Sequence, residues 1–189
     1  MASTGTVKAL GICGSLRKGS FNRAALRAAA ELLPDGMTLD VADISELPLY
    51  NEDVRQAGFP LPAQKLRDQI LAADALLFVT PEYNYSTSGV LKNAIDWASR
   101  PPDQPFDGKP VAIMGATASL WGTTRAQYDV RKMCVYLNMF PLNKPEVLIA
   151  QAANKFDGEL KLTDKTTREM ISQLMVALRD WTRRLSVSR

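Results

Sequence analysis

The chain has 189 residues, of which 46% are hydrophobic, and this is enough for one globular domain with a full-sized core. Its net charge of +3 is small and its basic residues are scattered, which argues against nucleic acid as a partner. Histidine is absent, so a Ser-His-Asp triad, a histidine base and a histidine-rich zinc site are excluded, and the two cysteines lack metal-ligand spacing.

Strand-like and helix-like segments alternate along the chain. Apolar runs predict strands at Val7–Cys13, Thr38–Asp43, Ala75–Thr80, Val111–Thr117 and Val147–Gln151. Helical patterns lie at Asn22–Leu33, Ala63–Ala72, Gly89–Ser99, Thr123–Asn138 and Thr163–Leu185. Central runs that are apolar throughout are typical of strands covered on both faces. The sequence therefore predicts a single α/β domain over residues 1–189, with a doubly wound, five-stranded parallel sheet and helices on both faces.

The first predicted strand turns into a helix through the segment Gly14–Asn22, the most informative part of the chain. The free N–H groups and the dipole of a helix N-terminus favour an anion. Gly14 and Gly19 allow close approach of the backbone, and Arg17 offers a planar guanidinium. Short side-chain donors are present at Ser15, Ser20 and Asn22. The segment predicts a phosphate-binding loop, with an ordinary βα turn rich in Ser and Gly as the alternative.

This segment is none of the better-known phosphate loops. A Walker A loop would need Lys and then Ser or Thr after its second glycine, but Ser20 and Phe21 follow Gly19. The spacing of the glycines does not match the dinucleotide fingerprint. A phosphocysteine mechanism would need an arginine at the position that Gly19 occupies after Cys13. We therefore expect a loop that binds a phosphate monoester without forming a covalent bond to it.

Two further predicted strands end in unusual residues. The third is followed by Pro81–Ser86 and the fourth leads into Gly115–Gly122, whereas the second ends in an ordinary Pro-containing connection, Ser45–Tyr50. Ligands of doubly wound sheets bind beyond the carboxyl ends of the strands, where the strand order reverses. Three loops that converge there predict a phosphate site beside aromatic and backbone-rich walls.

The sequence resembles the NADPH-dependent FMN reductase family of flavodoxin-like proteins, and most closely its bacterial chromate and quinone reductase branch. The matching blocks are GSLRKGSFN at 14–22, TPEYNYS at 80–86, GxLKNAIDW at 89–97 and DGKPVAI at 107–113. They occur in this order, and the resemblance extends over essentially the whole chain. It implies a flavodoxin-like fold, FMN as cofactor, and NADPH or NADH as co-substrate.

By position, the resemblance assigns the FMN phosphate to the first of the three loops. The residues that would hold it are Ser15, Arg17, Ser20 and Asn22. The residues that would shape the loop are Leu16, Lys18, Gly19 and Phe21. The residues that would border the isoalloxazine ring are Pro81, Glu82, Tyr83, Asn84 and Tyr85, with Thr117 from the third loop. In that third loop the chain departs from the Ser-Pro-Gly pattern common in the family. No residue is assigned as a catalyst, because hydride transfer between stacked rings needs no side-chain base. No metal site is expected.

The implied function is electron transfer from NAD(P)H through FMN to small oxidised acceptors, namely quinones, flavins or metal oxyanions such as chromate. The first alternative is a flavodoxin-type FMN electron carrier that does not itself oxidise NAD(P)H. Such a carrier would usually present an acidic docking surface, whereas this chain has a net charge of +3. The second alternative is a phosphate-binding regulator without flavin.

We expect a homodimer or homotetramer in the cytoplasm, with no membrane or nucleic-acid partner. The resemblance implies dimers that often pair into tetramers, and the cysteine pattern favours a reducing compartment. Apolar surface for a two-fold partner is expected at Gly58–Pro62 and in the regions of Trp97 and Trp121. Trp97 itself is expected to anchor either an interhelical or a subunit contact. Either a second interface or a solvated polar face is expected at Arg125, Tyr128, Glu146 and Asn154.

Some of these residues have simpler interpretations. Lys92 and Asp96 lie four positions apart in a predicted helix, which favours a surface ion pair. Cys13 ends a buried strand and is expected to pack in the core. The apolar stripe of the last helix is expected to pack on the sheet and comprises Met170, Leu174, Leu178, Trp181 and Leu185. For Glu82 the alternative to a flavin neighbour is a solvated carboxylate. For Tyr83 and Tyr85 it is a hydrophobic plug whose hydroxyl group contacts water.

Overall fold

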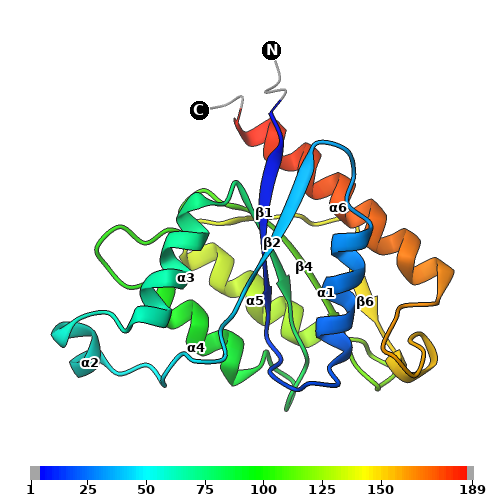
Figure 1. The fold of residues 1–189 in the computed structure, drawn as a ribbon, viewed down its shortest axis with the longest axis horizontal. Helices are drawn as coiled ribbons and strands as arrows, with labels where there is room; N and C mark the ends of the chain where they lie inside the picture. The colour runs from blue at the N-terminus through cyan, green and yellow to red at the C-terminus, as the bar shows by residue number, and fades with distance from the viewer. Residues whose placement is uncertain (1–4, 187–189) are drawn as a thin grey trace.

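The computed structural model describes residues 5–186. Its strands are β1 (Val7–Cys13), β2 (Met37–Ala42), β3 (Ala75–Val79), β4 (Pro110–Ala116), β5 (Phe140–Pro141) and β6 (Val147–Ile149). Its helices are α1 (Phe21–Glu31), α2 (Glu52–Ala57), α3 (Leu61–Ala72), α4 (Gly89–Ala98), α5 (Thr124–Tyr136) and α6 (Lys165–Ser186), with a single 3-10 turn, η1 (Ala152–Asn154). The strands form one sheet with helices on both of its faces (Figure 1).

The strands pair in parallel in the order β2-β1-β3-β4-β5, which confirms the predicted flavodoxin-like α/β fold. The fifth position differs from the prediction because two short strands share it. β5 lies opposite Pro110 and Val111 at the start of β4, while β6, the strand predicted at Val147–Gln151, lies opposite Met114–Ala116 at its end. The sequence pattern does not reveal β5, since it has only 2 residues and one of them is proline.

The five predicted helices are present as α1, α3, α4, α5 and α6, and their ends lie within two residues of the predicted ones. α2 is an additional helix. It has no buried residue, so no apolar periodicity marks it in the sequence. Among residues 5–186, no helix has the length and apolar character that crossing a membrane requires.

The core consists of two apolar clusters, one on each face of the sheet. Successive side chains of a strand point to opposite faces, so Ala9 of β1 joins the cluster under α1 and α6 while Leu10 joins the cluster under α3, α4 and α5. The five residues of β3 are all buried, as expected for a central parallel strand. Leu174 and Leu178 of α6 are fully buried in the first cluster and Met170 packs against it, which confirms these three positions of the predicted stripe. The other two positions, Trp181 and Leu185, are only partly buried.

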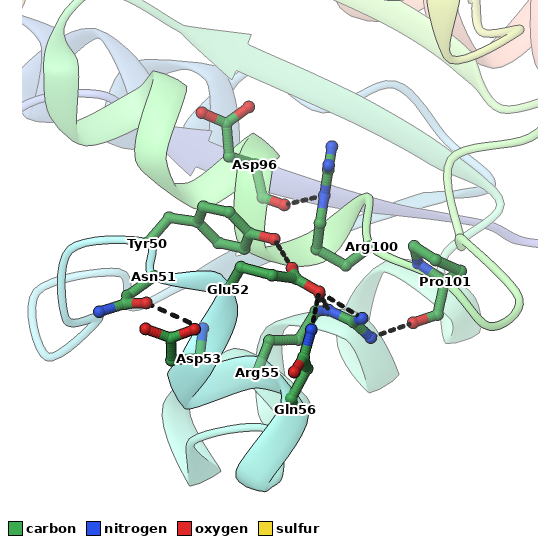
Figure 2. A network of polar contacts seen from close by, with 9 residues as sticks. All are labelled: Tyr50, Asn51, Glu52, Asp53, Arg55, Gln56, Asp96, Arg100 and Pro101. Carbon is green, nitrogen blue, oxygen red and sulfur yellow. Dashed lines mark hydrogen bonds and ion pairs between the residues drawn. The ribbon is translucent and has the colours of Figure 1, made fainter.

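A polar network fixes α2 to the segment that follows α4 (Figure 2). The carboxylate of Glu52 accepts a hydrogen bond from Tyr50 Oη at 2.5 Å and forms an ion pair with Arg55 at 2.6 Å. Arg55, and then Tyr50, lower the pKa of Glu52 to about 2. Arg55 also donates to the carbonyl of Pro101 at 3.3 Å. This network contains none of the residues predicted to bind FMN. We interpret it as a structural contact that holds the short helix α2 in place at the surface.

Trp97 of α4 is fully buried, and its indole N–H donates to the carbonyl of Pro48 at 2.8 Å. Its ring forms a T-shaped contact with the ring of Tyr50, with centroids 5.0 Å apart. Trp97 therefore anchors a contact within the chain and not one between subunits, and its own side chain offers no apolar surface to a second copy. Lys92 and Asp96 form an ion pair of 2.6 Å on the surface of α4, which confirms the surface pair predicted for these two residues.

Candidate functional site

The loops after β1, β3 and β4 are connected to one another at the carboxyl ends of these strands. We name them the first loop (14–20), the second loop (80–88) and the third loop (117–123). The N–H of Gly14 donates to the carbonyl of Val79 at 2.8 Å, and the carbonyl of Gly14 accepts from Ser88 Oγ at 2.6 Å. A Cβ on Gly14 would lie 2.8 Å from Ser88 Oγ and 3.2 Å from Pro81 Cδ, so a glycine is needed for this approach.

The first loop exposes a run of backbone donors. The N–H groups of residues 15–19 donate to no other group within residues 5–186. Ser20 is the N-cap of α1, and its Oγ accepts from the N–H groups of Asn22 and Arg23 at 3.2 and 3.4 Å. Arg17, Lys18 and Gly19 are exposed, whereas Ser15 is buried. A positive loop with free N–H groups at a helix N-terminus fits a phosphate monoester.

The side chain of Asn22 connects the first helix to the end of β4. Its Nδ2 donates to the carbonyl of Ala116 at 2.8 Å, and its Oδ1 accepts from the N–H of Ala116 at 2.8 Å. Asn22 is buried, so these two bonds occupy both ends of its amide in a place that water does not reach. We therefore revise its expected role from phosphate ligand to positioning residue, because its amide ties the first loop to the third.

Of the residues expected to shape the first loop, Phe21 packs against another aromatic ring, whereas Leu16 is exposed. The ring of Phe21 packs against Phe156 with centroids 5.3 Å apart, so it anchors the loop to the segment after β6. Arg17 lies 6.0 Å above the Phe21 ring, which leaves its guanidinium at the surface. Leu16 is 44% exposed and faces a groove described below.

The second loop contains a tight hairpin. Tyr83 and Ser86 exchange two backbone hydrogen bonds of 3.0 Å, and the two residues between them have positive φ angles, 50° for Asn84 and 66° for Tyr85. This is the pattern of a type I′ turn, whose second central position is usually glycine. Tyr85 adopts it at a cost of roughly 1–2 kcal/mol. Tyr83 and Tyr85 are 54% and 73% exposed, so the interpretation as hydrophobic plugs is wrong.

Glu82 is attached to the first turn of α5. Its side chain is only 7% exposed and pairs with Arg125 at 2.5 Å. It also accepts from the backbone N–H groups of Arg125 and Ala126 at 2.9 and 3.2 Å. The guanidinium of Arg125 in turn lies 3.7 Å from the centre of the Tyr85 ring. Glu82 is thus neither a solvated carboxylate nor a side chain free to face a ligand; it fastens the second loop to α5.

We expect Glu82→Ala to lower the free energy of unfolding by about 1–3 kcal/mol, because it leaves the helix N–H groups and Arg125 without their acceptor. The backbone amides of Tyr83 and Ser86 should then exchange with solvent at least about tenfold faster. Chemical denaturation and hydrogen exchange measure the two effects. Glu146→Ala is the matched control, since Glu146 forms an exposed pair with Lys144. Equal effects of the two substitutions would contradict this role of Glu82.

The second and third loops approach each other at Gly115, near the end of β4. A Cβ on Gly115 would lie 2.1 Å from the carbonyl oxygen of Thr80 and 2.2 Å from Thr123 Oγ1. Only a residue without a side chain therefore allows the end of β4 to pack this closely against the start of the second loop. The N–H of Thr117 donates to the carbonyl of Ile149 at 2.9 Å. Trp121 is 70% exposed. The predicted convergence of three loops is therefore present in the structure.

The two cysteines are buried and free. Burial raises the pKa of the Cys13 thiol and raises that of Cys134 to about 12. Since the thiolate is the reactive form, we expect both thiols to react with an aromatic disulfide at pH 8 at least about a hundredfold more slowly in the folded chain than in denaturant. Because the folded state raises the pKa of each thiol, the buried neutral thiols contribute fully to stability below the pKa of a cysteine in the unfolded chain. Their contribution declines as the pH rises from that value toward 12, the folded-state pKa of Cys134. A thiol that reacts at the unfolded rate would contradict this burial.

A cavity among the described residues borders the first loop on the side of β2, whereas β3 and β4 lie on the other side of β1. It is a groove of about 400 Å³ between α1 and β2. Its lining residues are Cys13, Ser15, Leu16, Arg23, Leu26, Arg27, Ala30, Val41, Ala42, Asp43, Ile44 and Ser45. Sequence reasoning missed this groove, because its residues follow the ordinary pattern of an amphipathic helix and an edge strand. Within residues 5–186 no cluster of His, Cys, Asp or Glu could hold a metal ion.

Comparisons with known proteins agree with this arrangement. The sequence model of the NADPH-dependent FMN reductase family matches residues 7–154. The chain is 60% identical to an NAD(P)H-dependent FMN reductase of Pseudomonas aeruginosa, over 95% of this chain and 97% of that protein. It is 40% identical to a quinone reductase of Escherichia coli, over 93% and 95% of the two chains. The solved structure of FerB, a flavoenzyme NAD(P)H:(acceptor) oxidoreductase from Paracoccus denitrificans, is similar with a TM-score of 0.85 and 32% identity, covering 94% of this chain and 98% of that one.

Proposed function

The chain belongs to the NADPH-dependent FMN reductase family, and we propose that its three converging loops are the site at which it transfers electrons from NAD(P)H through FMN to quinones. The observation that carries this assignment is the run of free N–H groups at residues 15–19, beside the exposed Arg17. Such a cradle fits the terminal phosphate of FMN in charge and in hydrogen-bonding capacity.

The chain's own residues bind and orient the cofactor. The first loop would hold the phosphate through its N–H groups, the hydroxyls of Ser15 and Ser20, and Arg17. Asn22 keeps this loop at a fixed distance from Ala116. The second loop and Thr117 would border the isoalloxazine ring.

When bound, FMN supplies the redox chemistry by accepting a hydride from NAD(P)H and passing electrons to the acceptor. The protein contributes a rigid frame for this reaction. Because Glu82 is fastened to α5, the exposed rings of Tyr83 and Tyr85 are held beside the site. No side chain is required as an acid or base for hydride transfer, which agrees with the absence of histidine.

We expect Arg17→Ala and, separately, Ser20→Ala to weaken FMN binding about ten- to a hundredfold, since each would remove a charge-assisted hydrogen bond to phosphate. Ser20→Ala should also lower the free energy of unfolding by about 1 kcal/mol, because it removes the N-cap of α1. Calorimetric titration of the apoprotein with FMN measures the affinity, and Arg184→Ala, an exposed arginine of α6, is the control. Parent-like affinity in both loop variants would mean that the phosphate binds elsewhere.

A flavodoxin-type carrier is the alternative that needs a direct test. A carrier would keep FMN bound but would not oxidise NAD(P)H without a separate reductase. Steady oxidation of NAD(P)H by the purified FMN-loaded protein in the presence of a simple benzoquinone would exclude the carrier. Binding of FMN with no NAD(P)H oxidation would support it and contradict the proposed function.

We further propose a cytoplasmic homodimer or homotetramer that also reduces flavins and metal oxyanions such as chromate. Apolar side chains near the site support an interface, since Leu120, Trp121 and Tyr128 are 71%, 70% and 57% exposed. The free, buried thiols fit a reducing compartment. Arg125, expected either in a second interface or on a solvated polar face, is engaged by Glu82 of its own chain, which reduces its availability to a partner. Light scattering at assay concentration tests the assembly, and a fully active monomer would contradict it.

A further inference from the structure

The turn between Tyr83 and Ser86 is strained and lies outside the core. Both of its central residues, Asn84 and Tyr85, have positive φ angles, and neither is a glycine. Backbone strain of this kind persists only where the surrounding structure holds the residues in place. The apolar core does not do so, because Tyr83, Asn84 and Tyr85 are all exposed. The turn must therefore be held by polar contacts at its two ends.

One helix, α5, makes contacts at both ends of the turn. Before the turn, Glu82 pairs with Arg125 of α5 at 2.5 Å. At its last residue, Ser86 Oγ donates a hydrogen bond to Asp129 Oδ2 at 2.6 Å. Arg125 and Asp129 are four positions apart on α5, so they lie on the same face of the helix. The turn is therefore held at each end by neighbouring side chains of one rigid element.

The carboxylate of Asp129 is a strong acceptor for the Ser86 hydroxyl. Lys132, and then Ser86, lower the pKa of Asp129, which keeps its carboxyl group ionised. A hydrogen bond to an ionised group is roughly twice as strong as one between neutral groups. The Asp129 side chain is only 24% exposed, whereas Lys132, which pairs with it at 2.6 Å, is 77% exposed. An ion pair with so exposed a lysine contributes little, so we attribute the attachment of the turn to the contact with Ser86.

We propose that Asp129 is a positioning residue for electron transfer to the quinone, and that it acts through Ser86 to keep the turn of the second loop in place. The proposal rests on the proposed function, in which the second loop borders the isoalloxazine ring. An acceptor that approaches this ring meets the exposed side chains of Tyr83 and Tyr85, so a loosened turn weakens the binding of the acceptor. The binding of FMN changes much less, because its phosphate is assigned to the first loop.

Hydrogen exchange of the FMN-loaded protein tests the contact without turnover. In Asp129→Ala and in Ser86→Ala, we expect the backbone amides of Tyr83 and Ser86 to exchange at least about tenfold faster than in the parent. Because Asp129 acts through Ser86, the double variant should exchange no faster than Asp129→Ala. Lys132→Ala removes the ion pair but leaves the contact with Ser86, so its exchange should be that of the parent. Parent-like exchange in Asp129→Ala, or equally fast exchange in Lys132→Ala, would overturn the proposal.

Steady-state kinetics separates a positioning role from a merely structural one. In Asp129→Ala we expect KM for a simple benzoquinone to rise at least about fivefold, while kcat and the dissociation constant of FMN stay within about twofold of the parent values. Asp129→Asn keeps an oxygen that can accept from Ser86, so it should return KM to within about twofold of the parent. The control for the lost charge is Asp107→Ala, because Asp107 accepts an equally short hydrogen bond, of 2.6 Å, from Asn138 at the surface. Its KM should be that of the parent.

The outcomes separate this role of Asp129 from the function itself. Faster exchange with an unchanged KM would make Asp129 a structural contact only and would overturn the proposal. A rise in KM that Asp129→Asn does not reverse, or that Asp107→Ala reproduces, would overturn it as well. A parent protein that oxidises NAD(P)H with benzoquinone, as Asp129→Ala then does equally well, keeps the proposed function and loses only this role of Asp129. A parent protein that does not oxidise NAD(P)H contradicts both.

Discussion

Asn22→Leu should lower the free energy of unfolding by about 2–5 kcal/mol and should weaken FMN binding by at least about tenfold. The substitution keeps the branching and the number of heavy atoms of the side chain but removes both hydrogen bonds to Ala116. The N–H and the carbonyl of Ala116 then remain buried without a partner, and each such group costs about 1–3 kcal/mol. The first loop also loses its connection to the third loop, so the phosphate cradle is no longer held in position. Chemical denaturation and FMN titration measure the two effects.

The chain offers a closely matched control for this substitution. Asn93 makes the same kind of paired contact, since its Nδ2 donates to Pro48 at 2.8 Å and its Oδ1 accepts from the N–H of Tyr50 at 2.8 Å. This contact is partly exposed, so water can replace the lost partner, and Asn93→Leu should cost about 1 kcal/mol or less. Its FMN affinity should remain that of the parent. Equal losses in the two variants would contradict the special position of Asn22.

Gly115→Ala should be the most damaging small substitution near the site, with a loss of about 3 kcal/mol or more in stability. The added Cβ would lie 2.1 Å from the Thr80 carbonyl oxygen and 2.2 Å from Thr123 Oγ1. The first of these atoms belongs to the backbone, so the end of β4 must move away from the second loop. Gly158→Ala is the control, because no atom lies within 4 Å of its Cβ position. Thermal unfolding compares them, and a parent-like melting temperature for Gly115→Ala would contradict the close packing at this point.

Sequence reasoning was most successful where local signals and periodicity agree. The run Val7–Cys13 is apolar and ends at a loop rich in Ser and Gly, and both its bounds match β1. The alternation of strands and helices was sufficient to predict the doubly wound sheet. It predicted β6 but not β5, because a strand of 2 residues that includes a proline shows no pattern in the sequence. Boundaries elsewhere shifted by one or two residues, as helix ends are set by caps and not by periodicity.

The roles of individual side chains were harder to predict, because they depend on partners far away in the sequence. Nothing local distinguishes Asn22 from a ligand of phosphate, since Ala116 lies 94 positions further along the chain. Glu82 resembles any loop carboxylate until its contact with Arg125, 43 positions away, is known. The groove between α1 and β2 arises from how much of the edge strand the helix leaves open, and no motif encodes that property.

The measurement that tests the central claim most directly is an anaerobic titration of the FMN-loaded protein with NADPH and with NADH, followed by visible absorption. The account predicts that the oxidised flavin bands bleach as about one equivalent of co-substrate is added, and that they return when a benzoquinone is added. A protein that binds FMN in the three loops but keeps its oxidised spectrum in excess NADPH and NADH would contradict the claim that this chain is an NAD(P)H-dependent reductase.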